Sequence, residues 1–183
     1  MAITHFKGKE VFTNADLPIR NKMVPDFELV KQDLKSVRLE DFLGKRIIFN
    51  IFPSIDTPTC ALSVRTFNEK AASIENTIVL CISKDLPFAQ SRFCGANGIK
   101  NVITLSEFRN NFFSTDYGVR ITNSPLLGLM ARAIIVTNQE GIVKYTELVA
   151  DISKEPNYTR AISEAQKIRC HPAMEAEHFE MHG

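Results

Sequence analysis

The chain has 183 residues, of which 44% are hydrophobic and 23% charged, a balance typical of a single globular domain with its own core. With 22 basic against 21 acidic residues the formal net charge is only +1, and no run of Lys and Arg indicates a nucleic-acid-binding surface. No segment is long and apolar enough to cross a bilayer, and the first residues lack the apolar core of a secretory signal, so we expect a cytoplasmic protein that binds neither nucleic acid nor membranes.

The first part of the chain predicts short strands and then one buried strand. Residues 3–7 and 10–13 flank a turn at Gly8, where glycine permits a positive φ, and predict a β-hairpin. A short extended piece follows at residues 25–30. Residues 46–52 form a nearly continuous apolar run, which is typical of a central strand covered on both faces.

The rest of the chain alternates helices and strands. After Pro53, apolar residues recur at spacings of three and four and predict a helix with its N-cap at Thr57. The elements expected after it are a strand at 77–83, a helix from about 85 to 97 ended by Gly98, a strand at 101–106, a short helix at 107–117, a hairpin of strands at 132–137 and 142–149, and a helix at 158–167. This order predicts an α/β fold with a mixed central β-sheet flanked by helices.

Four cysteines, Cys60, Cys81, Cys94 and Cys170, are too few for a disulfide scaffold, and none of them forms a Cys-x-x-Cys pair. Cys60 stands where a buried strand turns into a helix. The unpaired N–H groups of a first helical turn favour a thiolate, the nucleophilic form of cysteine. Position alone therefore indicates a reactive thiol at Cys60, with plain packing as the alternative, and it names no substrate.

The residues around Cys60 resemble a known family. Pro53-x-x-x-Thr57-x-x-Cys60 resembles the Pro-x-x-x-Thr-x-x-Cys motif of peroxiredoxins, and residues 50–57, 79–95 and 128–133 are similar to the bacterial thiol peroxidases, which are atypical two-cysteine peroxiredoxins. The similarity runs from the N-terminal hairpin to about residue 167. It implies one thioredoxin-like domain over residues 1–168, and we expect residues 169–183 to form a mobile C-terminal tail.

The resemblance also implies the roles of the site residues. Cys60 would be the peroxidatic cysteine, whose thiolate attacks one peroxide oxygen while the other leaves as water or an alcohol. Thr57 would hydrogen-bond both thiolate and peroxide, and Pro53 would shield the pocket. Arg132 would steady the thiolate and the charge that develops on the O–O bond. By position alone, Arg132 at the start of a strand reads as a surface charge.

The family cycle continues with a second cysteine of the same chain, and the matching residue is Cys94. Its thiol would resolve the Cys60 sulfenic acid as a disulfide. A bridge needs Cα atoms within roughly 7 Å, so we expect one or both helix ends to unwind if the two lie farther apart. The resemblance further implies re-reduction by thioredoxin or a similar dithiol protein and a homodimer, and we expect neither cofactor nor metal.

Two cysteines, Cys81 and Cys170, lie outside the implied cycle. Cys81 lies in a buried strand and is expected to be an inert core thiol. Cys170 and His178 lie in the tail; they suggest a metal site, but their spacing fits no closed zinc pattern. The sequence does not decide between hydrogen peroxide and alkyl hydroperoxides, although Phe93 and residues 126–129 favour a bulkier substrate. The alternative functions are a redox sensor or binding protein and a general thiol–disulfide oxidoreductase on the same fold.

Overall fold

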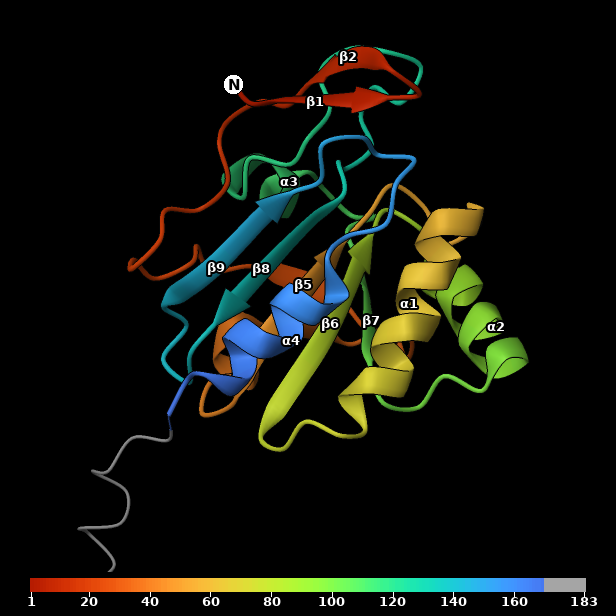
Figure 1. The fold of residues 1–183 in the computed structure, drawn as a ribbon. Coiled ribbons are helices and arrows are strands. Elements are labelled where there is room, and N and C mark those ends of the chain that lie inside the picture. Colours follow the sequence, from red (N-terminus) through yellow and green to blue (C-terminus); the bar gives the residue numbers. More distant parts are fainter. Residues whose placement is uncertain (170–183) are drawn as a thin grey trace, which may run out of the picture.

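The computed structural model describes residues 1–169, which form a seven-stranded mixed sheet, a separate two-stranded hairpin and four α-helices (Figure 1). The hairpin consists of β1 (Ile3–Phe6) and β2 (Lys9–Phe12). The strands of the sheet are β3 (Glu28–Val30), β4 (Ser36–Arg38), β5 (Arg46–Ile51), β6 (Thr77–Ser83), β7 (Ile103–Ser106), β8 (Ala133–Thr137) and β9 (Val143–Leu148). The helices are the 3₁₀ helix η1 (Leu39–Asp41), α1 (Pro58–Ala71), α2 (Pro87–Asn97), α3 (Phe112–Asp116) and α4 (Tyr158–Gln166).

Strand β5 lies inside the sheet between β6 and β8, in the strand order β4-β3-β7-β6-β5-β8-β9. All six of its residues are buried, as the apolar run predicts for a strand covered on both faces. It pairs in parallel with β6 and antiparallel with β8, and β6 pairs in parallel with β7. The loops after β5 and β6, which lead into α1 and α2, therefore leave the sheet at the same edge.

Two apolar clusters cover the faces of the sheet. One lies under α1, α2 and α4 (Figure 1) and includes Val64 and Phe67 of α1. The other is rich in aromatic residues: the Phe27 ring meets the Phe113 ring edge-on, and Phe113 stacks on Tyr117 with ring centroids 4.2 Å apart. Burial of these faces supplies the main stabilisation of the domain, since the hydrophobic effect grows with the apolar area removed from water.

The helix expected at residues 107–117 is shorter than predicted, because α3 spans only Phe112–Asp116. Glu107 lies before it with its side chain fully buried, forms an ion pair with Lys84 at 3.1 Å, and accepts a hydrogen bond from the backbone N–H of Ser114. The carboxylate thus satisfies an N–H group in the first turn of α3 from outside the helix. Glu107 belongs to the loop for this reason.

Most other predictions of fold are confirmed. Strand β6 covers the predicted residues, and α2 ends at Gly98, which has the left-handed φ of 62° that favours glycine there. The fold class is confirmed as mixed α/β with a central sheet and an N-terminal hairpin. None of the helices within residues 1–169 combines the length and apolarity needed to span a membrane. The predicted tail, with Cys170 and His178, lies outside the described residues apart from its first residue.

Candidate active site

Cys60 lies in the first turn of α1, directly after the loop that follows β5. Pro58 is the first helical residue, and Thr57 occupies the N-cap with an extended backbone, as predicted. As the third residue of the helix, Cys60 lies among N–H groups without a partner inside the helix and at the positive end of its dipole. The residue is only 1% exposed. Its sulfur therefore occupies a secluded position where a negative charge is stabilised.

Thr57 does not use its side chain to cap the helix. Its hydroxyl donates a hydrogen bond to the carbonyl oxygen of Ser54 at 2.8 Å, and its backbone N–H donates to the same oxygen at 3.1 Å. A hydroxyl has one proton to donate and two lone pairs to accept with. Because Ser54 takes the proton, Thr57 faces its surroundings as a hydrogen-bond acceptor.

Arg132 precedes β8 and is buried against Cys60. Its Nη2 donates to Cys60 Sγ at 3.2 Å and its Nε to the carbonyl oxygen of Ile152 at 3.0 Å. Position alone reads this residue as a surface charge, and that interpretation is wrong, because Arg132 is only 1% exposed. No carboxylate within residues 1–169 forms an ion pair with it. Buried charges are normally paired, and the side-chain atom that this guanidinium contacts is Cys60 Sγ.

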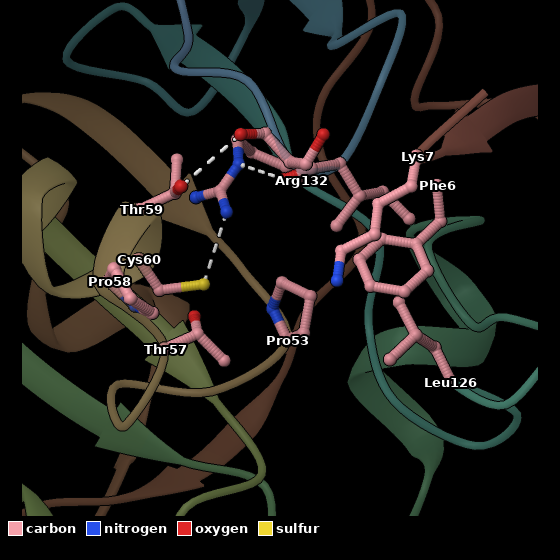
Figure 2. A pocket seen from close by; sticks show the side chains of 11 residues that line it. Phe6, Lys7, Pro53, Thr57, Pro58, Thr59, Cys60, Leu126 and Arg132 are labelled. Carbon is pink, nitrogen blue, oxygen red and sulfur yellow. Dashed lines mark hydrogen bonds between the residues drawn. The ribbon is translucent and has the colours of Figure 1, made fainter.

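These residues share one pocket of about 350 Å³ (Figure 2). Its lining brings together four of the predicted site residues, Pro53, Thr57, Cys60 and Arg132, and adds Phe6, Lys7, Pro58, Thr59, Leu126, Ile152 and Ser153. Figure 2 shows the Pro53 ring between Cys60 and the side chains of Phe6 and Leu126. The pocket therefore has a polar end at Cys60 and Arg132 and a largely apolar remainder.

The N-terminal hairpin contributes the part of this pocket that sequence reasoning missed. The backbone N–H groups of Lys7 and Gly8 donate to the Asp151 carboxylate at 3.2 and 3.0 Å, and this fixes the hairpin turn beside the loop that follows β9. The Ser153 hydroxyl, followed by these backbone N–H groups, holds the pKa of Asp151 below its usual range. The contact between Lys7 and Asp151 joins residues more than 140 positions apart, so no local sequence pattern predicts it.

Cys94, the fifth predicted site residue, lies outside the pocket. It is the eighth residue of α2, is 7% exposed, and is a free thiol like Cys60. Because α1 and α2 both start at the same sheet edge, Cys94 lies about 7.5 Å farther along its helix than Cys60 does along α1. Adjacent helix axes are themselves about 8–10 Å apart, so the two Cα atoms exceed the roughly 7 Å that a disulfide allows.

Cys94 and Cys81 are both buried, and burial raises the pKa of each thiol. Burial raises the pKa of Cys94, while hydrogen bonds with Thr104 and Gln32 act in the opposite direction. Burial raises the pKa of Cys81 to about 12, with a hydrogen bond from Asn50 opposing it. Cys81 is fully buried in β6, so its prediction as a core thiol is confirmed.

Comparison with known proteins agrees with this geometry. Residues 19–162 match the redoxin family. Thiol peroxidases of Corynebacterium glutamicum and Mycobacterium tuberculosis are 52% and 50% identical over 163 residues, covering 89% of this chain and 98% of each relative.

Solved structures of two related proteins have the same fold as this chain. A peroxiredoxin-like protein from Aquifex aeolicus is 33% identical with a TM-score of 0.85, over 91% of this chain and 97% of that one. A thiol peroxidase from Chromobacterium violaceum, 24% identical over the same shares of the two chains, has a TM-score of 0.84 and supports the fold. The chain thus belongs to the redoxin family and is a thiol-dependent peroxidase of the peroxiredoxin type.

Proposed function

We propose that this peroxidase uses Cys60 as its nucleophile and that Arg132, Thr57 and Pro53 complete the site. The observation that carries the proposal is the 3.2 Å contact between Arg132 Nη2 and Cys60 Sγ inside a pocket. The Cys60 thiolate attacks one oxygen of the peroxide and the O–O bond breaks. The other oxygen takes up a proton and leaves as water or an alcohol, and Cys60 becomes a sulfenic acid.

The neighbouring groups match the charges that develop in this step. Arg132 Nη1 is buried without a hydrogen-bond partner among residues 1–169 and can donate to a peroxide oxygen as negative charge moves onto it. Preorganised donors of this kind are a major source of transition-state stabilisation. The lone pairs of Thr57 can accept the peroxide O–H, and Pro53 shields the sulfur from water.

Cys94 is the resolving cysteine in this proposal. Its thiolate attacks the sulfur of the Cys60 sulfenic acid, water leaves, and an intramolecular disulfide forms. The separation of the two thiols along α1 and α2 requires one or both helix ends to unwind first. Unwinding also exposes Cys94 to water, which removes the burial that disfavours its thiolate.

The family implies a peroxide substrate and a thiol reductant. We propose thioredoxin or a similar dithiol protein as that reductant, because reduction of an intramolecular disulfide needs two thiols from the donor. We further propose that each chain forms one domain over residues 1–168 and that two chains form a homodimer in the cytoplasm. The alternatives, a redox sensor or a general thiol–disulfide oxidoreductase, are not favoured by the relatives, which carry the name thiol peroxidase.

The pocket supports organic hydroperoxides as substrates beside hydrogen peroxide. Leu126 lines it together with Phe6 and Ile152, so an alkyl group can exchange water for apolar contacts. Phe93, which the sequence also suggested for this purpose, is partly buried and packs instead against the core cluster under α1, α2 and α4. We expect a higher kcat/KM for tert-butyl hydroperoxide in the wild type than in a Leu126→Ser variant, with little change for hydrogen peroxide.

Stopped-flow peroxide reduction by the wild type, Cys60→Ser and Cys94→Ser tests the proposed cycle. We expect no activity above background in Cys60→Ser. Cys94→Ser should complete one fast turnover and then depend on an added external thiol. Sustained thioredoxin-coupled turnover by Cys60→Ser would contradict the assignment of the nucleophile.

A further inference from the structure

Asp85 connects the loop before Cys60 with the segment that leads to Cys94. It follows β6 and stands two residues before the start of α2. Its carboxylate accepts a hydrogen bond from the Ser54 hydroxyl at 2.7 Å and another from the backbone N–H of Ile55 at 2.7 Å. Both donors belong to the loop between β5 and α1, so one side chain ties the two loops at this sheet edge together.

The connection extends from Asp85 to the peroxidatic helix. The carbonyl oxygen of Ser54 accepts both the hydroxyl and the backbone N–H of Thr57, the residue directly before α1. Ser54 Oγ also accepts the backbone N–H of Asp56 at 3.2 Å. The position of Ser54, and with it the orientation of Thr57 in the pocket, therefore depends on the Asp85 carboxylate.

Asp85 is itself firmly anchored. Its carboxylate also accepts the hydroxyl of Ser83 at the end of β6, and its carbonyl oxygen accepts the hydroxyl of Ser106 at the end of β7. No Lys or Arg of residues 1–169 forms an ion pair with it. The charge is instead spread over three hydrogen bonds from neutral donors, and hydrogen bonds to a charged acceptor are stronger than neutral ones.

We propose that Asp85 is a positioning residue that holds the Cys60 loop in place and thereby sets how readily Cys60 is released toward Cys94. This inference rests on the proposed function, because it concerns the fate of the Cys60 sulfenic acid. That acid has two outcomes. It forms a disulfide with Cys94 and releases water, or it reduces a second peroxide, which yields a sulfinic acid and releases water or an alcohol.

The strength of the loop attachment decides between these outcomes. A loop held tightly keeps the sulfenic acid in the pocket, where it meets a second peroxide before it meets Cys94. In Asp85→Asn the charge is removed, and the amide NH₂ is satisfied only if the Ser54 hydroxyl turns from donor to acceptor, so the charge-assisted hydrogen bonds to the loop become weaker neutral ones. Release should then be faster, and the first attack on peroxide should slow severalfold because Thr57 is less well fixed.

Rapid quenching with a thiol-blocking reagent, followed by mass spectrometry of the Cys60 peptide, measures this partition at a fixed excess of hydrogen peroxide. We expect Asp85→Asn to convert the Cys60 sulfenic acid to the disulfide at least threefold faster than the wild type and to lower the sulfinic fraction at least threefold. Ser54→Ala removes one of the two loop contacts without touching Asp85 and should change both quantities in the same direction by a smaller factor. It also keeps the test valid if Asp85→Asn does not fold.

The matched control is Tyr117→Phe, which removes a partly buried hydrogen bond to the carbonyl oxygen of Pro25 on the other face of the sheet. It should lower the melting temperature without altering the partition. A sulfinic fraction that is unchanged or raised in the folded loop variants, or lowered equally in Tyr117→Phe, would overturn the role of Asp85. If the wild type itself forms no Cys60–Cys94 disulfide, the proposed function fails instead, so the two failures are distinguishable.

Discussion

The surroundings of Cys60 and Cys94 differ although both cysteines are buried. Cys60 has a buried arginine at 3.2 Å, the positive end of a helix dipole and a pocket in front of it. Cys94 lies within α2, where burial disfavours its thiolate and a hydroxyl and an amide are its hydrogen-bonding neighbours. In the proposed function, the first environment suits attack on peroxide in place, and the second holds a thiol that reacts only after local unwinding.

The largest effect on the rate of Cys60 oxidation should come from replacing Arg132. In Arg132→Met the rate of Cys60 oxidation should fall about 100- to 1000-fold, the range typical of losing one preorganised donor to a transition state. Stopped-flow measurement of the first turnover checks it. Arg132→Lys should recover only part of the loss, since one ammonium cannot bind both Ile152 and the sulfur as the guanidinium does.

Arg46 provides a matched control for this change. It is also a buried arginine and donates hydrogen bonds to the carbonyl oxygens of Ala165 and Glu75, away from the pocket. Arg46→Met should lower the melting temperature and leave the first-turnover rate of folded protein within about twofold of the wild type. Equal losses of rate in the two variants would mean that Arg132 supports the fold only.

A smaller effect on the same environment is expected at Thr57. Thr57→Val removes both the acceptor that faces the pocket and the donor to Ser54, and the first-turnover rate should fall about tenfold, equivalent to about 1.4 kcal/mol for a hydrogen bond. Thr57→Ser keeps the hydroxyl and should retain most of the rate. A valine variant as fast as the wild type would argue against any contact between Thr57 and peroxide.

The burial of Cys94 can be tested through the reactivity of its thiol. Burial raises its pKa in the folded, reduced protein, so at a given pH a smaller fraction is thiolate than in the unfolded chain. Alkylation by iodoacetamide, followed at the Cys94 peptide, should therefore have its pH midpoint at higher pH in folded than in urea-unfolded protein. At pH 8 it should be about tenfold slower or more in the folded state, because access also requires local opening. Coincident pH profiles would show that the Cys94 thiol is already accessible to the reagent in the reduced enzyme.

The smallest functional effect is expected at Cys81. Cys81→Ala should leave peroxidase activity unchanged but alter the dependence of stability on pH. A thiol whose pKa is raised to about 12 by folding, from 9.0, contributes stability that is complete below pH 9 and is lost as the pH rises toward 12. Urea unfolding at pH 8 and 10 should thus show a loss of stability that is larger in the wild type than in Cys81→Ala, by up to about 1.4 kcal/mol. Equal losses in the two proteins would contradict the buried, neutral thiol.

The sequence predicts local features well where a single pattern determines them. The apolar run from Thr77 to Ser83 predicts β6 to the residue, and Pro58 after Thr57 predicts the start of α1. The contact between Arg132 and Cys60 joins residues 72 positions apart, and composition and periodicity alone favour a surface charge there. Only the resemblance carried by the motif around Cys60 predicted that these two residues act together.

Other parts of the site depend on contacts that leave no local trace. Phe6 and Lys7 reach the pocket because Asp151 binds the hairpin turn, and Asp85 acquires its role because the loops after β5 and β6 meet. The helix predicted from Glu107 was too long for a similar reason, since an ion pair with Lys84 outweighs the helix preference of that residue. In each case tertiary contacts decided the outcome.

Peptide mapping of the wild-type protein after one equivalent of hydrogen peroxide tests the central claim most directly. We predict a disulfide that joins the Cys60 and Cys94 peptides in the full-length chain, with Cys81 still a free thiol. In Cys94→Ser the same treatment should leave a sulfenic acid at Cys60 that dimedone traps. Oxidation confined to another cysteine, or no bond between Cys60 and Cys94, would contradict the account.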